Sequence, residues 1–77
     1  MGERITNETL NARCHNVNRR LAGTGRNVFT QSRNGHTALD EGRVSDGETI
    51  RTITVGTKRE VADFLHAMMV GIDLSRG

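Results

Sequence analysis

The chain has 77 residues, of which 34% are hydrophobic and only two are aromatic, and its formal net charge is +2. A chain of this length forms a single domain with a small core, and no stretch approaches the roughly 20 apolar residues of a membrane-spanning helix. The one cysteine excludes an intrachain disulfide and a multi-cysteine metal site. We therefore expect one intracellular domain over residues 1–77 that gains stability by associating with further copies of itself.

The first element expected is a helix over residues 6–22, with Gly23 as its stop. One apolar stripe follows its length at steps of four, three and four residues: Leu10, Cys14, Val17 and Leu21. Cys14 is therefore interpreted as a small buried residue and not as a catalytic thiol. The opposite surface is dense in amide and guanidinium groups: Asn11, Arg13, His15, Asn16, Asn18, Arg19 and Arg20. Hydrogen bonds to a partner would explain this density, and plain exposure to water is the alternative for each residue.

A hairpin is expected next, because Asn34 and Gly35 tolerate the two positive φ angles of a type I′ turn. The flanking residues alternate as strands do, starting at Val28, and this turn pairs Arg33 with His36 and Phe29 with Asp40. Asp46-Gly47 has the same turn chemistry and leads into a third strand over residues 48–55.

Continuing the register through the third strand assigns its side chains to two faces. Arg51, Ile53 and Val55 fall on the face of Phe29, and Ile50, Thr52 and Thr54 fall on the face of Leu39. Both faces then carry apolar residues. Either helices cover one face and a partner the other, or the sheet contains a β-bulge, for which Gly42 is the candidate.

A second helix starts after Thr57, which forms a capping box with Glu60, and ends near residues 73–75. Its main apolar stripe consists of Val61, Phe64, Leu65, Met68 and Ile72. Further apolar residues extend the stripe most of the way round the helix: Ala62, Ala67, Met69 and Val70. Such a helix needs burial on two sides, and in a short chain the second side is most simply another subunit. The fold class is therefore α+β, an α-β-β-β-α order with a three-stranded antiparallel meander.

No segment carries a catalytic signature. The motifs G-x-S-x-G and H-E-x-x-H, a P-loop and a dinucleotide fingerprint are all missing, and the three histidines lie on three different elements. His66 has only Asp63 at helical spacing, so an interface histidine is favoured over a metal ligand. We expect a protein that is not an enzyme and that uses neither a metal ion nor a cofactor.

Anion binding is better supported. The second helix opens with Thr57, Lys58 and Arg59, so free N–H groups, the helix dipole and two cations coincide. Arg33 and Arg51 are expected beside Phe29, on which a base could stack. The alternative is that Arg51 pairs with Asp40 and that Phe29 belongs to the core.

Nucleic acid is the rival ligand. Double-stranded-RNA-binding domains share the α-β-β-β-α order and a basic start of the second helix. Here that start holds only Lys58 and Arg59, and the net charge is small for a protein that follows a phosphate backbone.

Two stretches resemble a group of small phage and prophage proteins: SRNGHTALD at residues 32–40 and RTITVGTKREVADFLHAM at residues 51–68. These proteins read R-x-G-x-x-A-L-D, a strand, and then T-K-R-E at the start of an apolar helix. The likeness covers roughly residues 28–73. Among such proteins the chain resembles the anti-Thoeris sponge family, which sequesters the cyclic ADP-ribose-type signal of a bacterial immune enzyme.

The resemblance implies an oligomer, a hexamer, that acts in the cytoplasm of the infected bacterial host and binds signals without cleaving them. It places Phe29, Arg33, Asn34 and Arg51 in a pocket for the ADP-ribose signal. Some members also hold cyclic di- or trinucleotides, and the residues implied for such a second site are His15, Arg19, Gly25 and Arg26. The scarcity of aromatic residues is a departure from the family.

Overall fold

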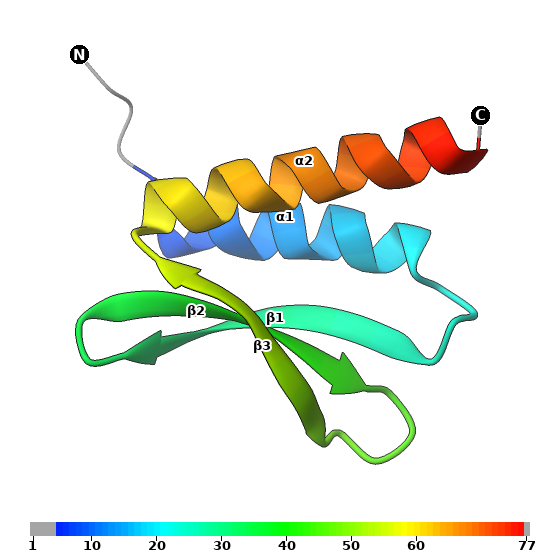
Figure 1. Cartoon of the computed structure of the whole chain (residues 1–77), viewed down its shortest axis with the longest axis horizontal. Helices are drawn as coiled ribbons and strands as arrows, with labels where there is room; N and C mark the ends of the chain where they lie inside the picture. Colours follow the sequence, from blue (N-terminus) through cyan, green and yellow to red (C-terminus); the bar gives the residue numbers. More distant parts are fainter. Residues whose placement is uncertain (1–4, 77) are drawn as a thin grey trace.

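The computed structural model describes residues 5–76 as two helices on one face of a three-stranded sheet (Figure 1). The elements follow the order α1 (Asn7–Arg20), β1 (Arg26–Arg33), β2 (His36–Arg43), β3 (Thr49–Gly56) and α2 (Lys58–Arg76). The strands are antiparallel in the spatial order β1-β2-β3. The predicted α-β-β-β-α meander is confirmed. Within residues 5–76, neither α1 nor α2 combines the length and the hydropathy of a membrane-spanning helix.

Both helices begin after a capping threonine, and the cap of α2 at Thr57 is the predicted one. The Thr6 hydroxyl accepts the backbone N–H of Thr9, at 3.2 Å. At α2 the backbone N–H of Glu60 donates to the Thr57 hydroxyl at 3.1 Å, and the Thr57 N–H donates to the Glu60 carboxylate at 3.0 Å, which is a complete capping box. α1 ends at Arg20, two residues before the predicted end, because the chain already turns at Leu21 to reach Gly23 with its φ of +88°.

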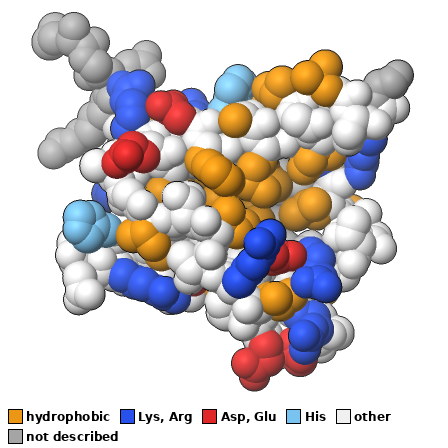
Figure 2. Space-filling view, viewed as in Figure 1, with side chains coloured by type: hydrophobic (Ala, Val, Ile, Leu, Met, Phe, Trp, Pro, Cys, Tyr) orange, Lys and Arg blue, Asp and Glu red, His pale blue; other side chains and the backbone are white. Residues whose placement is uncertain are grey.

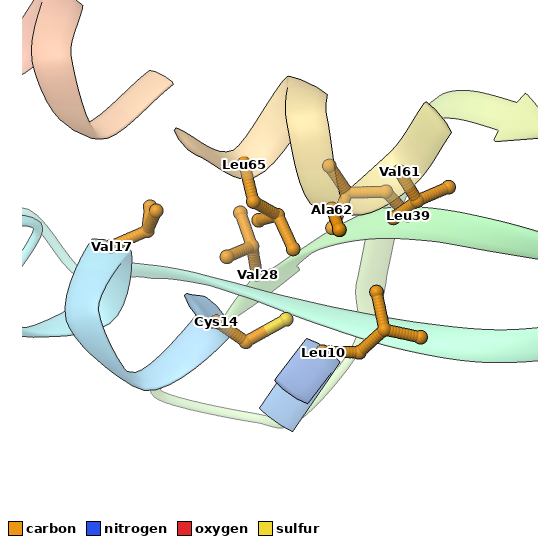
Figure 3. Packing of buried hydrophobic residues seen from close by; sticks show 8 residues of the cluster. All are labelled: Leu10, Cys14, Val17, Val28, Leu39, Val61, Ala62 and Leu65. Atoms are coloured by element: carbon orange, nitrogen blue, oxygen red, sulfur yellow. The ribbon is translucent and has the colours of Figure 1, made fainter. Parts of the chain in front are cut away.

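The core lies between the helices and the sheet. It consists of eight buried side chains, drawn in Figure 3: Leu10, Cys14, Val17, Val28, Leu39, Val61, Ala62 and Leu65. Burial raises the pKa of the Cys14 thiol, so this group stays protonated and acts as a packing residue. The predicted burial of Cys14 is confirmed.

The hairpin between β1 and β2 has the predicted turn and register. Asn34 and Gly35 have φ angles of +49° and +80°, and Arg33 pairs with His36 and Phe29 with Asp40. The connection from β2 to β3 is longer than a two-residue turn. The Gly47 N–H donates to the Arg43 carbonyl, and the Asp46 carboxylate accepts the Glu48 N–H at 2.9 Å, so Asp46 does stabilise the turn.

Two irregularities in β3 change which face its side chains occupy. Leu39 pairs with Thr54, but its neighbour Asp40 pairs with Thr52, so Ile53 is an extra residue. A second shift, between Glu41 and Gly42, leaves Ile50 as another extra residue, which places one bulge next to Gly42 as predicted.

The register predicted for β3 is therefore wrong at three positions. Arg51 pairs with Glu41 on the helix-covered face, Ile53 packs against the core, and Thr52 lies with Asp40 on the other face. The predictions for Val55, opposite Ala38, and for Thr54, opposite Leu39, are correct. The extra residue Ile53 reverses the alternation of side chains between the two faces for the residues just before it in β3. A strict two-residue period therefore placed Arg51 on the wrong face.

Asn18 closes the outer edge of β1. Its side-chain amide donates to the Val28 carbonyl at 3.0 Å, and its side-chain oxygen accepts the Val28 N–H at 2.7 Å. The side chain therefore occupies the place of a neighbouring strand. The interpretation of Asn18 as exposed or as bonded to a partner is wrong, because α1 crosses over β1 and brings this amide onto the strand.

Candidate functional site

The face of the sheet opposite the helices, called the open face below, carries the candidate site. Phe29, Arg33, Asp40 and Thr52 share it. Asp40 has no exposed surface even though no helix covers it. Neighbouring side chains on the open face therefore cover it, and two residues of this face, Phe29 and Arg33, were predicted as site residues.

Arg33, Asp40 and Thr52 form a closed hydrogen-bonded triangle. The Arg33 guanidinium lies 3.3 Å from one Asp40 carboxylate oxygen, and the Thr52 hydroxyl donates to the other at 2.8 Å. A second guanidinium nitrogen of Arg33 donates to the Thr52 hydroxyl at 3.2 Å. The alternative that paired Asp40 with Arg51 is wrong, and the cation that Asp40 holds is Arg33.

Phe29 is seated over Gly42. A Cβ atom added to Gly42 would lie 2.8 Å from the Phe29 ring and 2.8 Å from the Asn27 side-chain oxygen. Because Gly42 has no side chain, the Phe29 ring can lie directly against the backbone of β2 at this position. Phe29 pairs with Asp40, and the Arg33 guanidinium reaches the Asp40 carboxylate, so both side chains lie on the open face beside Asp40.

Arg51 is not part of this group. Its Nε donates to the Glu41 carboxylate at 2.8 Å on the helix-covered face, and Arg26 approaches the other carboxylate oxygen at 3.4 Å. The thickness of the sheet separates Arg51 from Phe29 and Arg33. The prediction that these residues share a face is wrong, and the cause is the bulge at Ile53. Asn34 lies at the hairpin tip next to Arg33.

The four residues implied for a second site are spread over different surfaces. Arg19 lines a hollow of about 370 Å³ between the ends of α1 and α2. Gly25 and Arg26 line a separate hollow of about 510 Å³ beside Asn18 and Val44. His15 is exposed and lines neither of them. Neither hollow is therefore lined by all four residues His15, Arg19, Gly25 and Arg26.

A third hollow, of about 360 Å³, brings together the starts of both helices and the hairpin, and apart from Lys58 its residues were not predicted as a site. Its lining is mostly polar: Asn7, Leu10, Asn11, Thr30, Gln31, Ser32, Thr37 and Lys58. A sequence signal was present, because Thr30, Ser32 and Thr37 share a face with Val28 and Leu39. Polar residues on a face that helices should cover indicate an opening to solvent.

The part of the chain that the structure describes holds no cluster of three or more residues able to bind a metal ion. His66 is exposed on α2. Comparison with protein-family models, with curated proteins and with solved structures finds no significant match to this chain.

Proposed function

We propose that this protein is a phage anti-defence protein that binds and sequesters cyclic nucleotide immune signals without cleaving them. The ligand class is the cyclic ADP-ribose isomers, extending to cyclic di- and trinucleotides, and the place of action is the cytoplasm of the infected bacterium. The observation that carries the proposal is the pair of Phe29 and Arg33 on the open face. A nucleotide offers a base that stacks on an aromatic ring and phosphates that accept from guanidinium.

Arg33 is suited to this role because it is both held and accessible. Asp40 and Thr52 orient its guanidinium, yet 47% of its side chain remains exposed. A guanidinium has five N–H donors, and the two bonds to Asp40 and Thr52 leave three for a ligand. A donor that is already oriented loses little entropy when it binds, which favours affinity.

Calorimetric titration with cyclic ADP-ribose isomers and with cyclic di- and trinucleotides tests the proposal. We expect saturable binding, with chromatography recovering the ligand unchanged. Phe29→Leu keeps an apolar side chain over Gly42 but removes the ring, and it should weaken binding by about tenfold, because one stacked base is worth about 1–3 kcal/mol.

The matched control is Phe64→Leu, the same change at the other phenylalanine, which lies on α2 and should leave the affinity unchanged. Equal weakening by both variants, or no binding of any of these ligands, would contradict the proposed site.

We also propose that the protein is a homo-oligomer, and the resemblance implies a hexamer. The outer face of α2 exposes three large apolar side chains beside the exposed Asp63, namely Phe64, Val70 and Leu74, with exposed fractions of 39%, 40% and 76%. Hydrophobic side chains gather along α2 and in the space between α2 and β3 (Figure 2). Both sheet edges resist pairing, since Asn18 caps β1 and two bulges interrupt β3, so a second copy would pack against α2.

The face is also self-complementary. In an antiparallel pair of α2 helices that crosses at Ala67, Phe64 of one copy meets Val70 of the other, and the contact is repeated by symmetry. Light scattering should show a species larger than a monomer, and Val70→Asp should reduce its mass. Val44→Asp, at an exposed valine of the loop between β2 and β3, should not. A wild-type monomer at about 100 μM would refute the assembly.

A nucleic-acid-binding module is the second candidate. The observation in its favour is that both helices pack on one face of the meander and that the hairpin, the start of α1 and Lys58 meet around one hollow. Salt-dependent retention of double-stranded RNA, without binding of the cyclic nucleotides, would establish this function in place of the first.

A further inference from the structure

The hollow between the C-terminal halves of α1 and α2 is lined by three arginines. Its volume is about 370 Å³ and its lining is Asn16, Arg19, Arg20, Met69, Asp73 and Arg76. It is remote from the open face, because both helices lie on the other side of the sheet. The second site implied by the resemblance includes Arg19 but neither Arg20 nor Arg76, so it does not account for this cluster.

Its charge is positive and is not neutralised from within. Three guanidinium groups face one carboxylate, which leaves two positive charges, as many as the net charge of the whole chain. The Arg20 Nε donates to the Asp73 carboxylate at 2.7 Å. This hydrogen bond lowers the pKa of Asp73 and raises that of Arg20, so both groups stay ionised and Asp73 offsets only one arginine.

Two of the arginines are held in place by backbone carbonyls. Arg20 also donates to the Asn16 carbonyl at 2.9 Å, and Arg76 donates to the Arg20 carbonyl. Cations near the ends of helices also offset the negative end of the helix dipole. These structural roles account for Arg20 and Arg76. They do not account for Arg19, which makes no hydrogen bond or ion pair within residues 5–76.

We propose that this hollow binds a phosphate-bearing anion, with Arg19 as the free ligand-binding cation and Arg20 and Arg76 as oriented donors. Guanidinium groups match the geometry of phosphate oxygens. The volume is that of a small-ligand site, and the partly buried Met69 supplies an apolar wall for a nucleoside. Phosphate binding stands independently of the open face, and only the choice of a nucleotide as carrier of the phosphate rests on the proposed function.

Calorimetric titration of the full chain with inorganic pyrophosphate and with ADP tests this site. Arg19→Gln should weaken pyrophosphate binding by about tenfold, because a charge-assisted hydrogen bond to phosphate is lost. The melting temperature should not change, because Arg19 has no partner within residues 5–76 to lose. Tighter binding of ADP than of pyrophosphate would identify a nucleotide ligand, and equal binding would identify the phosphate group as the whole determinant.

The matched control is Arg43→Gln, which removes the same charge from an exposed arginine that does not line the hollow. Equal weakening by the two variants would show that only the general positive field attracts the anion, and this would overturn the proposal, as would no binding at millimolar pyrophosphate. Phe29→Leu separates the two sites, since it should leave pyrophosphate binding intact.

Discussion

Replacing Arg33 with alanine is expected to lower the free energy of unfolding by about 2–3 kcal/mol, whereas Arg51→Ala is expected to lower it by less than about 1 kcal/mol. Arg33→Ala leaves the fully buried Asp40 carboxylate with the Thr52 hydroxyl as its one side-chain partner within residues 5–76. Removing one partner of a buried pair typically costs about 3–5 kcal/mol, and the half-exposed Arg33 lets water recover part of that cost. Arg51 is 69% exposed, so its bond to Glu41 is a surface ion pair.

Urea titration followed by circular dichroism measures both variants. The double variant Arg33→Ala with Asp40→Asn should be more stable than Arg33→Ala alone, because the second change removes the uncompensated charge. A larger loss of unfolding free energy for Arg51→Ala than for Arg33→Ala would mean that Asp40 is paired with Arg51. This pairing was the alternative considered for a sheet without the bulge at Ile53. The same measurements are a control for the binding experiment. A loss of affinity in an Arg33 variant is evidence for the site only where the variant remains folded.

Replacing Asn18 with alanine is expected to destabilise the protein by about 2 kcal/mol. The change removes two hydrogen bonds, at 2.7 and 3.0 Å, and leaves both backbone groups of Val28 without their partner. Val28 is only 2% exposed, so water does not readily replace the lost amide. The edge of β1 would also become available for pairing with another strand, so we expect a greater tendency to aggregate.

The control is Asn11→Ala, on the same helix at an exposed position. This change should leave stability unchanged or raise it by about 0.5 kcal/mol, because alanine is the better helix former. Thermal unfolding gives both values, and hydrogen exchange at the Val28 amide should accelerate in the Asn18 variant alone. Identical stabilities for the two variants would show that the Asn18 bonds contribute nothing to the fold.

The signals that succeeded in the sequence were local ones. The capping box of Thr57 and Glu60, the Asn34-Gly35 turn and the apolar stripe of α1 each depend on residues separated by four positions or fewer from the next. The turn also determines the pairing of β1 with β2, because a two-residue loop leaves one register only. Order and type of the elements, the first hairpin and the burial of Cys14 therefore followed from the residues alone.

Only the tertiary structure decided which side chains meet. The bulge at Ile53 lets Ile53 pack into the core while Thr52 still reaches Asp40, and so it moves Arg51 to the opposite face of the sheet from Phe29. Likewise, Asn18 hydrogen-bonds to β1, and Arg19 lines the same hollow as Arg76, only because α1 crosses the sheet beside α2. Interactions between residues a few positions apart determined the helices, the strands and the first turn, since the hydrogen bonds and torsion angles that define these elements are local. The candidate sites depend on contacts between distant segments, which packing settles and which a repeating pattern along the chain does not encode.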